Sequence, residues 1–222
     1  MAPSASASLA ALLPEGIRER LRAARAAWRD ARDWEAYRRA PVVPPPHAVK
    51  VRAVIDCARR HGIEVLVETG TFEGEMARKC RDAFREIHTI ELDPGLAERA
   101  ARRLGPWPWI HVHAGDSADL LPRLLERLPE PVLFWLDGHY SGAGTAHGAE
   151  ETPLPREIET IAARRLGGDA VLVDDARLLG TGAYPTAGAI RARLEAAHSN
   201  YVLTLEADML RWEPISREGN AR

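Results

Sequence analysis

Three aspartates stand at the ends of two strongly apolar stretches. Asp137 follows the run FWL, and Asp174 and Asp175 follow the run VLV. If both runs are strands of a parallel sheet, their carboxyl ends share the edge at which such sheets bind ligands. Three carboxylates this close need a cation, a proton or a basic group between them, and an all-oxygen set favours Mg²⁺ or Mn²⁺ over Zn²⁺. The structural alternative is that Asp137 hydrogen-bonds loop amides and Asp175 caps a helix.

A turn containing glycine follows an earlier apolar run, in VLVETGTFEG from Val65 to Gly74. Gly70 and Gly74 would let the backbone bend sharply and approach a ligand closely. The helix N-terminus that follows offers free N–H groups to a carboxylate. A tight strand–helix turn without a ligand explains the same residues. The spacing is not GxGxxG, which argues against NAD or FAD.

Two further acidic positions follow the next strand candidates. Glu91 ends the second strand, about 20 residues beyond the first, where a carboxylate reaches the ribose of a nucleoside ligand. Asp93 precedes a proline and is better suited to cap the next helix. In AGDS, after the third strand, Asp116 or Ser117 is placed to meet an adenine edge, although a helix cap is an equally good explanation.

Two histidines share one face of the third strand candidate. His111 and His113 suggest zinc, but no cysteine or third ligand accompanies them in the sequence. We therefore favour a structural role for this pair.

The elements that must position these residues alternate strand with helix. Strands are predicted at 64–69, 86–91, 109–114, 131–137 and 170–174, and helices at 75–84, 96–104, 118–128 and 155–166. A helix at 186–198 and two strands at 201–206 and 209–214 follow. The pattern predicts an α/β fold with a mostly parallel seven-stranded sheet and an antiparallel C-terminal hairpin.

Before the sheet comes an N-terminal helical extension. We expect residues 1–14 to be disordered, 15–46 to form a helix and a proline-rich spacer, 47–216 to form the main domain, and 217–222 to be a tail. The extension carries a basic stripe, which is better explained as a solvated flank than as a clamp on an acidic group. We expect a homodimer to form through this helix.

Composition excludes several classes of protein. The 222 residues include 45% hydrophobic and 28% charged, with a net charge of −2, so nothing favours nucleic acid or anionic lipid as a general partner. Two cysteines cannot make a disulfide framework. No apolar stretch approaches the roughly 20 residues that span a bilayer, and the N-terminus lacks a basic n-region. The expectation is a cytoplasmic protein with no membrane partner.

Taken in order and spacing, these motifs resemble the class I S-adenosylmethionine-dependent methyltransferases. They are most similar to the metal-dependent small-molecule O-methyltransferases of the catechol and macrocin types, over roughly residues 65–177. The resemblance implies a Rossmann-like class I methyltransferase fold, the cofactor S-adenosyl-L-methionine, and Mg²⁺ or Mn²⁺. It also implies methylation of an oxygen on a hydroxylated small molecule.

The resemblance implies a role for each matching residue. The cofactor would be bound by Glu68, Gly70, Thr71, Phe72, Gly74, Glu91, Asp116, Ser117 and Asp137, and the metal by Asp137, Asp174 and Asp175. The lysine base of the catechol type has no match here. His139, two residues beyond the first metal aspartate, would instead take the proton of the acceptor hydroxyl as general base. The Gly/Ala-rich segment 140–152 is either a lid over the acceptor or an ordinary surface loop.

Three alternatives stay open. The aspartates could shape a polar pocket in a metal-free methyltransferase. The chain could bind the cofactor without catalysis, as a regulatory or scaffold protein. A nicotinamide oxidoreductase is a distant third, because the glycine spacing differs.

Overall fold

In the computed structural model, residues 13–128, 131–138, 152–164 and 167–215 are described. The chain divides into two compact units, Met1–Lys50 and Val51–Arg222. The division falls inside one helix, α3 (His47–His61). The predicted disordered N-terminus and the tail lie almost wholly outside the described residues.

The first unit contains one long helix. Helix α2 spans Glu15–Arg39, within the range in which the sequence predicts a helix and a proline-rich spacer. Its start has no side-chain cap, and the carbonyl of Pro14 accepts the amides of Ile17 and Arg18 instead. Ile17, Leu21 and Trp28 are exposed along it.

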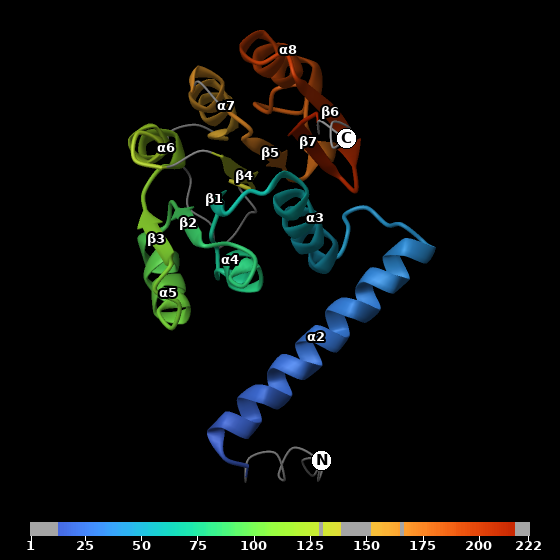
Figure 1. Cartoon of the computed structure of the whole chain (residues 1–222), viewed down its shortest axis with the longest axis vertical. Coiled ribbons are helices and arrows are strands. Elements are labelled where there is room, and N and C mark those ends of the chain that lie inside the picture. The colour runs from blue at the N-terminus through green and yellow to red at the C-terminus, as the bar shows by residue number, and fades with distance from the viewer. Residues whose placement is uncertain (1–12, 129–130, 139–151, 165–166, 216–222) are drawn as a thin grey trace, which may run out of the picture. The chain divides into compact units, whose positions relative to one another are not determined.

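The second unit is built on a seven-stranded sheet with the order β3-β2-β1-β4-β5-β7-β6 (Figure 1). Strands β1 to β5 are parallel, whereas β7 runs antiparallel to both β5 and β6. The strands are β1 Val65–Thr69, β2 Glu86–Glu91, β3 Ile110–Ala114, β4 Val132–Leu136, β5 Ala170–Val173, β6 Tyr201–Glu206 and β7 Met209–Pro214. The predicted fold class, including the C-terminal hairpin, is confirmed.

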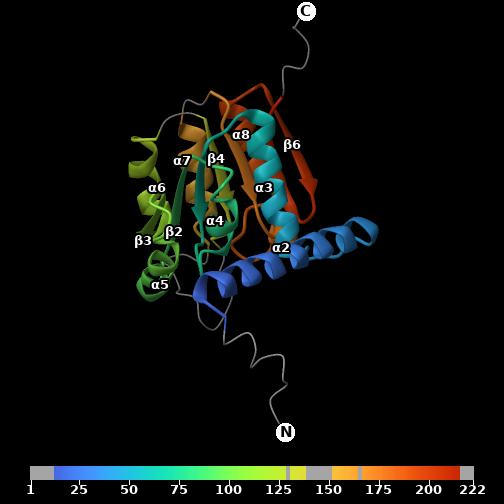
Figure 2. The same ribbon diagram turned by 60° about the horizontal axis from the view of Figure 1, so that its bottom comes forward.

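Helices cover both faces of this sheet (Figures 1 and 2). One face carries α3, α4 and α5, and the other carries α6, α7 and α8. Besides α3, the helices are α4 Glu75–Cys80, α5 Pro94–Leu104, α6 Ser117–Leu125, α7 Leu154–Ala163 and α8 Ala187–Ala197, with a 3₁₀ turn η1 at Ala176–Leu178.

The central strand β4 explains why this two-sided arrangement is stable. All five of its residues are buried. Successive side chains point to opposite faces, so Phe134 packs into one apolar cluster and Trp135 into the other. A strand buried on both faces needs an unbroken apolar run, which the sequence provides.

Several helix ends differ from the prediction. Helix α4 ends at Cys80 rather than at residue 84. The Arg81 guanidinium donates to the carbonyl of Arg78, and Phe84 is buried in the core beside α3. Phe84 therefore leaves the helical path to pack inside, and the chain turns early into β2. Helices α6 and α7 also end sooner than expected, at Leu125 and Ala163.

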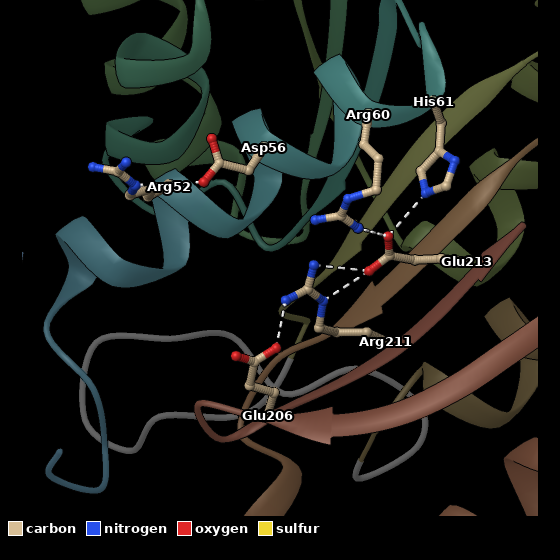
Figure 3. Close-up of polar contacts among 7 residues, drawn as sticks. All are labelled: Arg52, Asp56, Arg60, His61, Glu206, Arg211 and Glu213. Atoms are coloured by element: carbon tan, nitrogen blue, oxygen red, sulfur yellow. Dashed lines mark hydrogen bonds and ion pairs between the residues drawn. The ribbon is translucent and has the colours of Figure 1, made fainter. Parts of the chain in front are cut away.

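An ion-pair network joins α3 to the hairpin (Figure 3). The carboxylate of Glu213 on β7 accepts from Arg60, from His61 Nε2 at 2.9 Å and from Arg211 Nε at 2.8 Å. Arg211 Nη1 also donates to Glu206 at 3.0 Å. Burial would raise the pKa of Glu213, but the hydrogen bond with His61 and the two guanidinium charges lower it. The carboxylate thus stays charged and stabilises the packing of α3 on the sheet.

In the described part of the chain, none of the helices is long and apolar enough to cross a membrane.

Candidate active site

The carboxyl ends of β1, β2, β4 and β5 lie side by side. Thr69 of β1 is in register with Ile90 of β2 and with Leu136 of β4, and Leu136 is in register with Val173 of β5. The residues that follow these four strands therefore meet at one edge of the sheet. The structure brings together there the glycine turn, Glu91, and the three aspartates.

The glycine turn needs its glycines for two separate reasons. Gly70 has φ +88°, and a Cβ there would lie 2.4 Å from the backbone oxygen of Asp137. Gly74 has φ +73°, and a Cβ there would lie 2.8 Å from Leu104 Cδ1. Gly70 lets the chain after β1 pass close to the backbone that follows β4. Gly74 lets α4 begin in contact with Leu104 of α5.

Glu91 fixes the turn from the neighbouring strand. Its Oε2 accepts the Phe72 amide at 2.7 Å, and its Oε1 accepts the Asp93 amide at 3.0 Å. Phe72 itself has φ +48°, and its side chain is 56% exposed. Thr71 makes a further tie to β2 through a 2.5 Å contact between its hydroxyl and that of Thr89. The buried Glu91 carboxylate thus fixes the backbone of the turn at Phe72, whose aromatic side chain is exposed.

Glu68 is a buried acid at the same edge. It is only 2% exposed, and its Oε2 has no hydrogen-bond partner among the residues that the structure describes. Burial raises its pKa to about 8, with Asp137 and Glu91 adding to the rise and a hydrogen bond with Thr89 opposing it. Glu68 is therefore mainly protonated at pH 7 and would ionise beside a cationic ligand.

Asp116 and Ser117 lie at the start of α6. Asp116 caps the helix, accepting from the Ala118 amide at 2.9 Å. The Ser117 hydroxyl donates to Glu157 Oε1 of α7 at 2.5 Å. Asp93 caps α5 in the same way, as expected, accepting from Leu96 at 2.7 Å. Cofactor contacts by Asp116 and Ser117 remain a prediction.

The sequence interpretation missed Glu157. It is 1% exposed, and burial raises its pKa to about 7 against hydrogen bonds from other side chains. A signal was present: in α7 Glu157 lies on the same face as the buried Leu154, Ile158 and Ile161. An acid on the apolar face of a helix marks a buried polar contact.

The three aspartates form a compact acidic group. One carboxylate oxygen each of Asp137, Asp174 and Asp175 lies within 4.8 Å of the others. Asp174 Oδ1 accepts the Asp175 amide at 2.8 Å, and Asp175 has φ +51°. A cavity of about 20 Å³ beside them is also lined by Tyr184 and Glu157.

The donor set fits a hard divalent cation. Three carboxylates that converge on a small cavity match the oxygen ligands that Mg²⁺ prefers. A positively charged side chain also contacts this group. Arg177 donates to Asp175 Oδ1 at 2.8 Å and pairs with Asp208 of the β6–β7 turn. Arg177 is thus shared between Asp175 of the acidic group and Asp208 outside it.

Two expected features lie outside the described residues. They are His139 and the segment 140–152, of which only the buried Thr152 is described.

The histidines of β3 share one face of the sheet, where His111 is in register with His88 and His113 is in register with Ile90. His88 on β2 joins them, with its Nδ1 3.0 Å from His113 Nε2. Burial lowers the pKa of both His88 and His113. Both rings are therefore neutral at pH 7.

Comparison with solved structures identifies the class of fold. The O-methyltransferase TomG from Streptomyces achromogenes, solved with SAM, aligns with a TM-score of 0.54 and 21% identity over 83% of this chain and 88% of its own. The Bacillus cereus O-methyltransferase, solved with SAH, gives 0.53 and 15% over 84% and 90%. The Podospora anserina methyltransferase PaMTH1, also bound to SAH, gives 0.51 and 15% over 91% and 98%. No protein-family model matches the chain, and no curated protein matches it in sequence.

The chain has the class I methyltransferase fold. The strand order, the antiparallel last pair and the structural likeness all agree on this.

Proposed function

We propose that this chain is an S-adenosylmethionine-dependent methyltransferase that methylates an oxygen of a hydroxylated small molecule. The observation that carries the proposal is the meeting of the glycine turn with Glu91 and the aspartates at the carboxyl ends of adjacent strands. In open α/β sheets this is where ligands bind. The solved structures of the same fold include O-methyltransferases bound to SAM or SAH, which supports the same class of reaction.

The site suits each part of this cofactor. Glu91 would accept hydrogen bonds from the ribose hydroxyls, and Asp116 and Ser117 would lie against the adenine. Gly70, Thr71, Phe72 and Gly74 would leave backbone room for the methionine part. Its ammonium group would face the acidic side chains of Glu68 and Asp137, where a positive charge is favoured.

Asp137, Asp174 and Asp175 would hold Mg²⁺ or Mn²⁺. When bound, such an ion lowers the pKa of an acceptor hydroxyl and fixes its position. The residues of the chain would hold the acceptor oxygen in line with the methyl group. This positioning lowers the entropic cost of bringing the two reactants together. His139 would remove the hydroxyl proton, for which a neutral imidazole is suited near pH 7. We expect His139→Ala to lower turnover about a hundredfold and to leave cofactor affinity unchanged.

Turnover is tested by mass spectrometry. The full chain is incubated with S-adenosylmethionine, Mg²⁺ and a panel of catechols, other phenols and sugar alcohols. The proposal expects one acceptor to gain a methyl group in step with the formation of S-adenosylhomocysteine. Cofactor binding without methyl transfer to any acceptor would favour the regulatory or scaffold alternative.

The metal requires a separate test. Arg177 already supplies a positive charge at Asp175, as a metal-free methyltransferase would require. Mg²⁺ should raise the melting temperature of the wild type, since it binds only the folded chain. Asp174→Asn should abolish this rise while leaving S-adenosylhomocysteine affinity nearly unchanged. Turnover that survives exhaustive chelation would support the metal-free alternative.

A further inference from the structure

A second group of metal-ligating side chains lies on the sheet, away from the acidic edge. Strand alternation places Glu86 and His88 on one face of β2, and His111 and His113 on one face of β3. The parallel register pairs His88 with His111. The sequence offered only the two histidines of β3, and the sheet supplies the third and fourth side chains.

The distances between these side-chain atoms are close to those between the ligands of a bound ion. His88 Nε2 is 2.9 Å and His111 Nε2 is 3.8 Å from Glu86 Oε1, and one ligand atom of each residue lies within 4.8 Å of the others. Tetrahedral ligands about 2.0–2.1 Å from a zinc ion lie about 3.3–3.4 Å from one another. The first distance is slightly short and the second slightly long. Small side-chain rotations would place an ion between all three.

His113 supplies the support that metal-binding histidines usually have. Its Nε2 lies 3.0 Å from His88 Nδ1. If His88 binds an ion through Nε2, its Nδ1 carries the proton and donates to His113. Such a partner fixes the tautomer and orientation of the ligand.

The group is accessible from solvent. The side chain of His111 is 43% exposed and that of Glu86 is 27% exposed, whereas His88 is 9% exposed. The other oxygen of Glu86 pairs loosely with Arg85, at 3.7 Å, and Oε1 faces the histidines. An ion could enter from the His111 side, and water could complete its coordination.

We propose that Glu86, His88 and His111 form a binding site for one divalent transition-metal ion of the Zn²⁺ type, with His113 as a positioning residue. Two imidazoles and a carboxylate match the ligand preference of Zn²⁺, Ni²⁺ and Cu²⁺, whereas the all-oxygen edge suits Mg²⁺. A bound ion would join the edge strand β3 to β2. The proposal does not depend on the methyltransferase activity.

The other cluster with a comparable ligand set is less suited to a metal. Cys57, His61 and Glu213 also lie within 4.8 Å of one another. Burial raises the pKa of the Cys57 thiol, so it is protonated at neutral pH. The Glu213 carboxylate is already bound by two guanidinium groups (Figure 3). A metal there would have to displace Arg60 and Arg211.

Co²⁺ and Zn²⁺ serve as the probes on the full chain. With excess Mg²⁺ present to occupy the three aspartates, Co²⁺ should give visible d–d absorption that saturates at one ion per chain, and Zn²⁺ should abolish it by competition. His111→Gln and Glu86→Gln should each weaken Zn²⁺ binding by at least about tenfold. His113→Ala should weaken it about 10–100-fold, as expected for a supporting partner, while leaving the form of the Co²⁺ spectrum intact.

Matched variants locate the ion. His47→Gln removes an exposed histidine of α3 and should leave affinity and spectrum unchanged. Circular dichroism and the melting temperature establish that each variant is folded before titration. The proposal is overturned if His111→Gln and Glu86→Gln bind Zn²⁺ as the wild type does, or if binding is lost in His61→Gln and kept in His111→Gln. It is equally overturned if the wild type shows no saturable Co²⁺ binding.

Discussion

At the scale of single residues, Glu68 contributes to the pH dependence of the protein's stability. Burial raises its pKa from 4.5 to about 8, so the native state binds a proton that the unfolded chain has lost over most of this range. Stability falls with pH wherever the folded state binds more protons. We expect the free energy of unfolding to fall as pH rises from about 4.5 to about 8. Glu157, whose pKa rises to about 7, contributes to the lower part of this range.

Denaturant unfolding of the wild type and Glu68→Gln at about pH 6.5 and about pH 8.5 measures the effect. The neutral amide cannot ionise, so the variant should lose less stability over this interval than the wild type. Glu126→Gln, an exposed acid at the end of α6, is the control. An equal loss in wild type and Glu68→Gln would show that the buried carboxyl does not titrate as stated.

Glu91 has two tasks that different substitutions separate. Glu91→Ala removes the acceptor for the Phe72 amide and the acceptor that we propose for the ribose, and we expect it to weaken binding of S-adenosylhomocysteine by about 1–3 kcal/mol. Glu91→Gln keeps one acceptor oxygen for the Phe72 amide and should lose less. Titration calorimetry measures both. Wild-type affinity in Glu91→Ala would remove this residue from the cofactor site.

At the scale of elements, the turn after β1 depends on one backbone conformation. Gly70→Ala places a Cβ at φ +88° and within 2.4 Å of the Asp137 carbonyl oxygen. The left-handed conformation alone costs about 1–3 kcal/mol for a residue other than glycine, and the close approach adds to this. We expect a lower melting temperature and loss of S-adenosylhomocysteine binding.

Gly16→Ala is the matched control, because nothing lies within 4 Å of a Cβ at that helical position. It should leave binding unchanged and stability equal or slightly higher, since alanine favours helix. Equal melting temperatures for the two variants would contradict the role given to Gly70.

The bounds of the helices and strands show which parts of the fold can be predicted from the sequence. Strands β2, β6 and β7 have the predicted bounds, because alternating or unbroken apolar runs define strands locally. The end of α4 was missed because it depends on where Phe84 packs, which is a tertiary contact. The partners of the site were missed for the same reason. Arg177 reaches Asp208 and Ser117 reaches Glu157 across 31 and 40 residues, and no local pattern links them.

At the scale of the whole molecule, α2 argues for self-association. Helix α2 exposes Ile17, Leu21 and Trp28 at helical spacing, and an apolar stripe of this kind is typical of a helix face that packs against a partner. We expect the full chain to be a homodimer through this face. Leu21→Glu with Trp28→Glu should give a monomer in light scattering coupled to size exclusion. Ala23→Glu, on the opposite side of the helix, is the control, and a wild-type monomer at micromolar concentration would contradict the expectation.

We propose that S-adenosylmethionine binds across the carboxyl ends of β1 and β2, next to the acidic group. Electron density from a crystal grown with S-adenosylhomocysteine and Mg²⁺ tests it most directly. We expect the ribose at Glu91, the methionine part over residues 70–74, and a hard cation between Asp137, Asp174 and Asp175. Density for the cofactor product at another part of the molecule, or an empty edge at saturating concentration, would contradict it.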